Sequence, residues 1–278
     1  MQYEQNTLRR LQLAELGILK DIDRVCREHS ITYWLDSGTV LGAVRHGGFI
    51  PWDDDIDIGM PRDDYERFLG VAPMALGPRY CVTNPHTCSR QAAQFAKVML
   101  AGTRFVTDES EEAEFEQGIF VDVFPYDAVF VDSAAAKRQR RSCMLWQTIS
   151  YLYHSGNIVV PHKGLLGAAE RFFCRAAHVF VKFFFNPDSI CSRFENAALA
   201  ANNISNAGGL MVSAYASTGP FPREMLLPPS LIEFEGCFFM APADARGYLK
   251  RVYGEKWNQL PPIDQRRNHA PKRLVFES

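Results

Sequence analysis

Two aspartates, Asp55 and Asp57, are separated by a single apolar residue, and Ile58 follows them. Alternate residues of a strand face the same side, so a strand over residues 55–60 would project both carboxylates from one half-buried face. Two acids on one face repel each other, and burying them without a partner costs several kcal/mol. A hard divalent cation removes that cost. We therefore expect Mg²⁺, or Mn²⁺, between them, with a solvated acidic loop as the alternative.

The segment Ser37-Gly38-Thr39 lies between a predicted strand over 31–36 and a predicted helix over 39–46. Glycine lets the backbone approach a ligand closely, and the free amide groups of a helix start attract phosphate oxygens. Next to the acids, this segment predicts a phosphate cradle, although alone it would be an ordinary helix cap. Arg45 could add a two-pronged hydrogen bond to a phosphate, or it could be a surface arginine.

A third carboxylate, Asp122, is the single acid of a strongly β-favouring segment over 119–124. Phe120 and Phe124 share its face, which favours a partly desolvated acid that serves as a metal ligand or a general base. Asp53 is the competing candidate for the base. An exposed acid on an edge strand is the alternative, because Pro125 follows directly.

Longer strings extend these motifs along the chain. They are Gly38-Thr39-x-Leu41-Gly42-x-x-Arg45, Phe49-Ile50-Pro51-Trp52-Asp53-Asp54-Asp55-Ile56-Asp57, Met60-Pro61-Arg62-x-Asp64-Tyr65, Val121-Asp122-Val123-Phe124-Pro125, and Tyr253-Gly254-x-x-Trp257-x-x-Leu260-Pro261-Pro262 with Arg266 and His269. In this order they resemble the LicD family of the nucleotidyltransferase-fold superfamily, which includes the fukutin-type sugar-alcohol phosphate transferases.

The resemblance implies a transferase that moves a phosphorylated small alcohol onto a hydroxyl of a cell-surface glycan, lipopolysaccharide or teichoic-acid precursor. Phosphocholine from CDP-choline is the expected group, and CMP is released. The acceptor is then a glycan or a lipid-linked glycan. The resemblance also implies that Asp55, Asp57 and Asp122 form the acidic trio of the fold and that Asp53 is a further acid.

Other contacts to substrate follow more loosely. The resemblance suggests that Lys97, Arg266 and His269 contact phosphate or nucleotide, although a solvated lysine and an ordinary basic tail are the alternatives. Trp52 and Tyr65 could hold a quaternary ammonium group by cation–π attraction, or they could be core aromatics.

Three other functions remain open. The same acids could serve a nucleotidyltransferase that modifies a small molecule, or a transferase that uses CDP-ribitol or CDP-glycerol. A catalytically silent binding protein is the third.

Composition excludes other classes of protein. The chain has 278 residues, of which 47% are hydrophobic, and a net charge of −2, so we expect a globular protein that does not bind nucleic acid. Its seven cysteines include no Cys-x-x-Cys pair, which argues against a disulfide framework. Cys81, His86 and Cys88 suggest zinc but lack a fourth ligand. The polar start predicts no signal peptide and a cytoplasmic protein.

The expected fold is α+β or α/β, with a nucleotidyltransferase-like mixed sheet flanked by helices. Residues 1–130 would form the catalytic core, and residues 131–278 a mainly helical region whose C-terminal hairpin and tail complete the site. We predict helices over 7–28, 39–46, 134–154, 165–185, 188–201 and 242–251, strands over 31–36, 55–60, 80–83, 95–100, 104–107, 119–124 and 210–215, and a hairpin over 231–240 that turns at Glu235-Gly236. The apolar, basic helix over 165–185 is expected in the core, with peripheral contact at the inner face of the membrane as the alternative.

Overall fold

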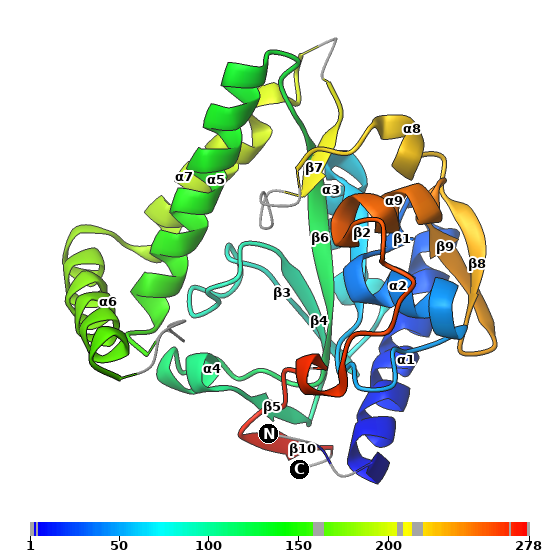
Figure 1. Ribbon diagram of the computed structural model, residues 1–278, viewed down its shortest axis with the longest axis horizontal. Coiled ribbons are helices and arrows are strands. Elements are labelled where there is room, and N and C mark those ends of the chain that lie inside the picture. The colour runs from blue at the N-terminus through cyan, green and yellow to red at the C-terminus, as the bar shows by residue number, and fades with distance from the viewer. Residues whose placement is uncertain are drawn as a thin grey trace.

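A mixed β-sheet forms the centre of the molecule (Figure 1). The computed structural model describes residues 3, 5–157, 164–204, 208–212, 219–266 and 268–276. Within these residues the sheet has the order β1-β2-β6-β4-β3, and β7 also pairs with β6. Its strands are β1 (Trp34–Leu35), β2 (Asp57–Pro61), β3 (Tyr80–Thr83), β4 (Ala96–Leu100), β6 (Phe120–Ala128) and β7 (Leu210–Val212). The expected mixed sheet with flanking helices is confirmed.

The long strand β6 is the centre of this sheet, and every one of its residues is buried. It runs parallel to β2 and antiparallel to β4 and β7. Pro125 lies within the strand, between residues 120–123, which pair with β4, and residues 126–128, which pair with β7. The missing N–H of this proline is tolerated at that break. The edge-strand alternative for Asp122 is therefore wrong.

The helices α1 (Gln5–Glu28) and α3 (Arg62–Ala75) pack against β6. A buried ion pair fixes α3: Arg62 Nε and Nη2 donate to the two carboxylate oxygens of Asp127 at 2.8 and 2.7 Å. Asn202 also donates to Asp127, at 2.9 Å. This network joins α3, β6 and the residue that follows η1 (Leu199–Ala201).

The remaining elements surround α2 (Ser37–His46) and the lower edge of the sheet in Figure 1. The hairpin of β8 and β9 turns at Glu235 and Gly236, whose φ angles of 54° and 70° suit a two-residue turn, as expected. β10 pairs with β5, so the tail returns to the core. The bounds are β5 (Arg104–Val106), α4 (Asp108–Glu112), α8 (Arg223–Leu226), β8 (Ser230–Phe234), β9 (Cys237–Ala241), α9 (Ala245–Tyr253), η3 (Ile263–Gln265) and β10 (Arg273–Val275).

Three helices form an arm on one side of the sheet (Figure 1). They are α5 (Ser133–His154), α6 (Gly164–Phe184) and α7 (Pro187–Ala198), and α5 packs against both others. The chain leaves the sheet after Ala128 and returns at Leu210, and these two residues pair with each other. The whole arm is thus an insertion between the end of β6 and the start of β7, which lie side by side in the sheet.

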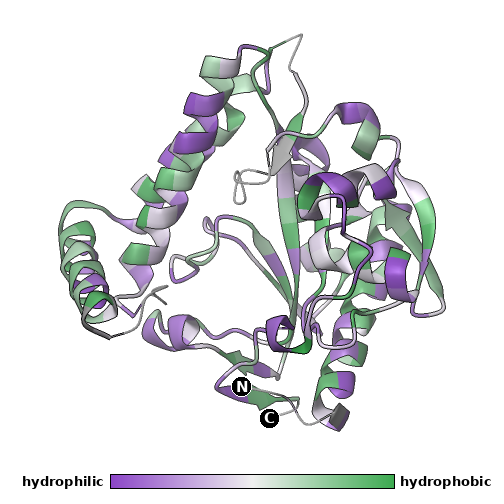
Figure 2. Ribbon diagram, viewed as in Figure 1, coloured by the Kyte–Doolittle hydropathy of each residue, from purple (hydrophilic) through white to green (hydrophobic). Residues whose placement is uncertain are grey.

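The outer helix of this arm, α6, is rich in hydrophobic residues (Figure 2). Many of its large apolar side chains are exposed. Phe183 is 81% exposed, and the other large exposed groups of α6 are Leu166, Phe172, Phe173, Val179, Phe180 and Phe184. The prediction that this segment is a core helix is therefore wrong, because α6 packs on α5 and leaves its wide aromatic side uncovered. None of the helices in the described ranges combines the length and apolarity needed to cross a bilayer.

Candidate active site

Three charged residues stand in a row across the sheet. In the strand register Asp57 of β2 pairs with Asp122 of β6, and Asp122 pairs with Lys97 of β4. Directly paired residues share a face, with Cβ atoms about 5 Å apart. Lys97 Nζ donates to Asp122 Oδ1 at 2.6 Å and lies 3.8 Å from the centre of the Phe120 ring. Lys97 is thus buried against Asp122, not solvated on the outer face.

Two further acids join the row from the loop before β2. Asp55 lies in this loop, because β2 begins at Asp57, two residues later than the prediction. The carboxyl groups of Asp53 and Asp55 are close enough for each to shift the pKa of the other. Burial, then the neighbouring aspartates, raise the pKa of Asp53 to about 8, and burial is also the main cause that raises the pKa of Asp55 to about 6.

Burial raises the pKa of both strand acids as well. For Asp57 the charges of Asp55 and Asp122 act in the same direction. For Asp122 the neighbouring Lys97 acts in the opposite direction and favours the ionised form. Four carboxylates crowded in this way carry unfavourable charge at neutral pH, and their oxygens are of the kind that holds a hard cation.

The C-terminal tail reaches this cluster through His269. Asp54, which is fully buried, accepts a hydrogen bond from the His269 backbone N–H at 2.8 Å and another from Tyr3 Oη at 2.8 Å. His269 Nδ1 lies 3.5 Å from both Asp54 Oδ1 and Asp55 Oδ2. The interaction of the His269 ring with Asp54 is the main cause that raises the pKa of His269 to about 9. Asp54 therefore anchors the tail, and His269 brings positive charge to the acids.

The cradle segment is built around a buried acid that the sequence motifs did not single out. Asp36 caps α2, which begins at Ser37, and its carboxylate accepts hydrogen bonds from Tyr126 Oη at 2.8 Å and from Tyr248 Oη. A Cβ atom on Gly38 would lie 2.8 Å from Asp53 Oδ2, so any other residue here would displace the Asp53 carboxylate. The start of α2 is thereby fixed beside Asp53.

Thr39 has a different place from the one expected. Its Oγ1 accepts a hydrogen bond from the backbone N–H of Asp57 at 2.8 Å, and it lines neither of the cavities described next. Thr39 thus joins α2 to the first residue of β2 and positions Asp57 without facing a ligand.

Two cavities meet at the acids, and both are lined by Asp55, Asp57 and His269. We call the first the cradle cavity, whose other lining residues are Asp36, Ser37, Gly38, Asp53, Tyr126, Tyr248 and Tyr253. We call the second the aromatic cavity. It is lined by Phe95, Phe105, Phe115, Phe120 and Tyr151 together with Lys97, Glu109 and Asp122. The acids therefore lie between a tyrosine-rich cavity at the start of α2 and a phenylalanine-rich cavity to which α5 of the arm contributes Tyr151.

Four other predicted contact residues have partners of their own. Arg45 Nη1 donates to the carbonyl groups of Trp257 and Gln259 at 3.2 and 3.3 Å, so it holds the tail segment. Arg266 covers the ring of Trp52 at 4.6 Å. Tyr65 is buried beside Arg62, whose guanidinium lies 5.2 Å from its ring. Tyr65 is therefore a core aromatic, which was the alternative to a cation–π contact with the ligand. Arg267 lies outside the described residues.

Two acids near the site carried no local signal in the sequence. Glu15 of α1 is fully buried, neither of its carboxylate oxygens has a hydrogen-bond partner, and burial raises its pKa well above the usual range. Glu109 of α4 lies in the aromatic cavity, and burial raises its pKa to about 7. Glu15 occupies a helix position typical of a solvated acid, so only the packing of α1 reveals it.

Sequence comparison agrees with this arrangement of residues. Residues 30–177 match the family model described as LicD/FKTN/FKRP, nucleotidyltransferase domain. This match covers more than half of the chain. The chain belongs to the LicD family.

Individual relatives support the assignment. The lipopolysaccharide cholinephosphotransferase LicD of Haemophilus influenzae is 27% identical over 279 residues, which cover 97% of this chain and 98% of that protein. An uncharacterised protein of Rickettsia typhi is 44% identical over 61 residues, or 22% of this chain and 20% of that protein. Human ribitol 5-phosphate transferase FKRP is 53% identical over 34 residues, or 12% of this chain and 7% of FKRP.

The segment that matches the family model contains most, but not all, of the residues of the site in this LicD-family chain. It includes the buried cap Asp36, the acids of the loop before β2, Lys97 and Asp122. Tyr248 and His269 lie beyond its end. The acids and the residues of the aromatic cavity other than His269 therefore lie in the matched segment, whereas the C-terminal tail does not.

Proposed function

We propose that this protein is a metal-dependent transferase that moves phosphocholine from CDP-choline onto a hydroxyl of a cell-surface glycan precursor and releases CMP. The observation that carries the proposal is the row of Asp57, Asp122 and Lys97 between two cavities of different character. The near full-length similarity to a lipopolysaccharide cholinephosphotransferase supports the same group and the same class of acceptor.

The acids fit a divalent cation. Burial and neighbouring carboxylates raise the pKa of both Asp53 and Asp55, so these groups repel when they are ionised, and a cation would relieve the repulsion. We propose that Asp55, Asp57 and Asp122 hold Mg²⁺ or Mn²⁺, with Asp53 beside them. When bound, this cation would neutralise charge on the diphosphate and stabilise the departing CMP.

The residues of the chain would then position the reactants. The start of α2 at Gly38 and the tyrosines of the cradle cavity would receive the CMP part of the donor. Lys97, which reaches from β4 to Asp122, would contact the phosphate of the transferred group. Because Lys97 also favours the ionised form of Asp122, this carboxylate would accept the proton of the acceptor hydroxyl. Asp53 is the second candidate for this step.

The aromatic cavity favours choline as the alcohol. Lys97 lies over the rings of Phe95 and Phe120, so Phe105, Phe115 and Tyr151 are the rings that would attract a quaternary ammonium group by their electron density. Glu109 lies among them, and a neighbouring cation would favour its ionised form. Ribitol and glycerol instead require hydrogen-bonding groups for several hydroxyls, and aromatic faces do not supply them.

Product analysis with two differently labelled forms of the donor tests the proposal. The protein is incubated with lipid-linked glycan precursors, Mg²⁺ and CDP-choline labelled either in choline or in cytidine. Transfer of the choline label and release of labelled CMP are expected, and both are lost in Asp57→Asn. Transfer of the cytidine label would instead establish a nucleotidyltransferase. Turnover of CDP-ribitol or CDP-glycerol in preference to CDP-choline would overturn the choice of alcohol.

Glu109 allows a sharper test of the choline subsite. Glu109→Gln keeps the shape of the side chain but cannot become negative, so the KM for CDP-choline is expected to rise about tenfold, the effect of about 1.4 kcal/mol, with little change in kcat. Glu116→Gln, an exposed acid of the following loop, is the control. An unchanged KM in Glu109→Gln would remove choline from this cavity.

We further propose that α6 rests on an anionic membrane surface, which would bring the site near a lipid-linked acceptor. Its exposed phenylalanines are accompanied by Arg171, Arg175 and Lys182, a composition typical of helices that lie in the headgroup region. Flotation with vesicles containing anionic lipid is expected for the wild type and lost for Phe183→Glu. Met74→Glu is the control for the added charge, because Met74 is 90% exposed but lies on α3. This variant should float with the vesicles as the wild type does. A wild type that stays with the soluble fraction at low salt would refute the contact.

A further inference from the structure

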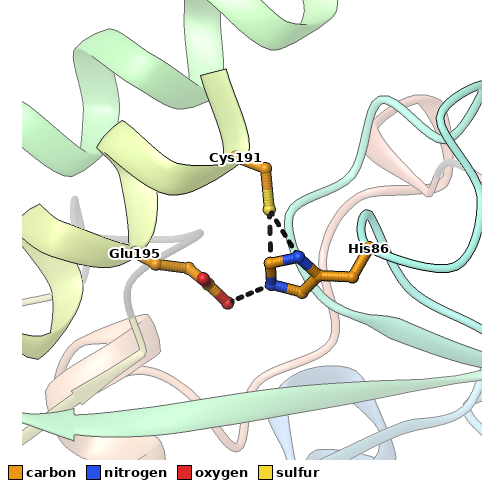
Figure 3. A group of neighbouring side chains, drawn as sticks. All are labelled: His86, Cys191 and Glu195. Carbon is orange, nitrogen blue, oxygen red and sulfur yellow. Dashed lines mark hydrogen bonds and ion pairs between the residues drawn. The ribbon is translucent and has the colours of Figure 1, made fainter. Parts of the chain in front are cut away.

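A second group of potential metal ligands lies between the arm and the sheet, apart from the acids (Figure 3). Within the described parts of the chain, His86, Cys191 and Glu195 form the one trio of such groups whose ligand atoms all lie within 4.8 Å of one another. His86 Nε2 is 2.8 Å from Glu195 Oε1 and 3.7 Å from Cys191 Sγ. The histidine ring therefore faces both side chains of the helix.

Local structure holds all three residues in place. Cys191 and Glu195 are four positions apart on α7, so they lie on one face of the helix. The start of α7 is fixed by a capping box at Asn186. His86 follows β3 in a turn in which the side chain of Asn84 accepts the backbone N–H of His86 at 2.9 Å. The three side chains are thus held close together by the fold without a bound metal ion.

The distances suit a tetrahedral ion. With Zn–N and Zn–O of about 2.0–2.1 Å and Zn–S of about 2.3 Å, the ligand atoms of a tetrahedral site are separated by roughly 3.3–3.6 Å. The observed N···O distance of 2.8 Å is about 0.5 Å shorter and the N···S distance of 3.7 Å is close to these values, so small side-chain shifts would admit the ion. One nitrogen, one sulfur and one carboxylate oxygen are the donors that Zn²⁺ accepts in proteins.

The trio also has an open side. His86, Cys191 and Glu195 border a small cavity whose other lining residues include Arg62, Tyr65 and Glu66. Three protein ligands leave a fourth position of a tetrahedral ion for water. Burial raises the pKa of the Cys191 thiol to about 12, so the apo protein keeps its thiol proton and a metal must displace it.

We propose that His86, Cys191 and Glu195 bind Zn²⁺, which links α7 of the arm to the loop that follows β3. This inference does not depend on the proposed transferase activity, because none of the three residues lines the cradle cavity or the aromatic cavity. On binding, the Cys191 thiol loses its proton to solvent, and neutral His86 and ionised Glu195 supply the other two ligands. The sequence alone had pointed to Cys81 and Cys88 as partners of His86, whereas the structure brings the thiol of Cys191 to it, 105 residues away.

Cobalt provides a direct test, because Co²⁺ replaces Zn²⁺ and gives an intense charge-transfer band only when a thiolate is a ligand. The chelator-treated full chain is titrated with Co²⁺ and then with Zn²⁺. We expect the band to rise to one equivalent and to disappear when Zn²⁺ is added. The acids of the active site contain no sulfur, so Co²⁺ bound there does not contribute to the band.

Variants locate the site. Cys191→Ala should abolish the band, whereas Cys88→Ala, a cysteine close to His86 in the chain but outside the trio, should retain it. Glu195→Gln keeps the thiol and should weaken Zn²⁺ binding at least about tenfold, as expected when a charged ligand becomes neutral. If Cys191→Ala fails to fold, Glu195→Gln still tests the site. No band in the wild type, a band that persists in Cys191→Ala, or unchanged affinity in Glu195→Gln would overturn the proposal.

Discussion

Replacing Asp55 by asparagine should stabilise the metal-free protein while removing its response to Mg²⁺. The pKa of Asp55 is raised from 3.8 to about 6, chiefly by burial, and its side chain is only 27% exposed. At neutral pH the ionised group is therefore unfavourable in the folded state by about 3 kcal/mol, at about 1.4 kcal/mol for each pKa unit. Asparagine keeps the shape and removes the charge.

The pKa of about 6 already includes the attraction of His269, so the ion pair is not subtracted again. Solvent reaches part of the Asp55 side chain and screens its charge, which reduces the expected gain to about 2 kcal/mol. For a chain of this size such a gain raises Tm by about 5 °C.

The sign of the pH dependence follows from the same shift. A raised carboxyl pKa means that the folded state holds the proton more tightly, so stability is lost as pH rises from about 4 to about 6. The advantage of Asp55→Asn should thus be small near pH 4.5 and complete above pH 6.5. Differential scanning fluorimetry with and without Mg²⁺ measures both effects. Asp63→Asn, an exposed acid in the first turn of α3, should lower Tm slightly if at all.

A lower Tm for metal-free Asp55→Asn at pH 7.5 would refute the view that the acids are crowded. An advantage that stays constant between pH 4.5 and pH 7.5 would contradict the raised pKa. An undiminished rise of Tm with Mg²⁺ would show that Asp55 is not a metal ligand.

Three further outcomes are expected. Mg²⁺ should raise Tm more at pH 8 than at pH 6, because Asp53, with a pKa of about 8, loses its proton in this interval; an equal rise would contradict the shift. Arg62→Leu should lower the free energy of unfolding by about 3–5 kcal/mol in urea titrations, because it leaves Asp127 buried without its cation; a loss below about 1 kcal/mol would show that this pair is dispensable. Lys97→Met should reduce kcat by about a hundredfold, and Lys97→Arg should restore part of it, in assays of CMP release; unchanged turnover would remove Lys97 from the site.

Elements with strong local signals were predictable from the sequence. The strand predicted over 80–83 is observed at Tyr80–Thr83, and the helix predicted over 134–154 is observed at Ser133–His154. The hairpin turn at Glu235-Gly236 also formed as expected, since both residues adopt positive φ. Alternation and turn residues are local properties, so they can be read without knowledge of the neighbours. The described part of the strand predicted over 210–215 is Leu210–Val212, and the rest lies outside the described residues.

The packing partners of each helix and strand were not predictable in the same way. Periodicity identified the apolar side of α6 but not that α5 leaves it exposed. It did not show that the side chain of Thr39 is bound to the backbone of Asp57, because a helix start offers the same residue types for a ligand or for packing. The order of the strands was equally hidden, since Pro125 argues for an edge but lies in the central strand.

The site itself was predictable in part. The aspartates of the loop and Asp122 were identified by type and spacing, and the strand register brings Asp57 and Asp122 together. Glu109 and the rings of the aromatic cavity come from segments that carry no motif, so only the tertiary fold assembles them. The role of Asp54 as an anchor for His269 depends on a contact across 215 residues.

The pairing of Ala128 with Leu210 has a consequence for how this family can diversify. A segment that starts and finishes at adjoining points of a rigid scaffold can be exchanged as a module without moving the scaffold. Since the row of charges is fixed by backbone pairing inside the sheet, lengthening, trimming or replacing the three inserted helices would leave that row in place, although it would change Tyr151 in the aromatic cavity.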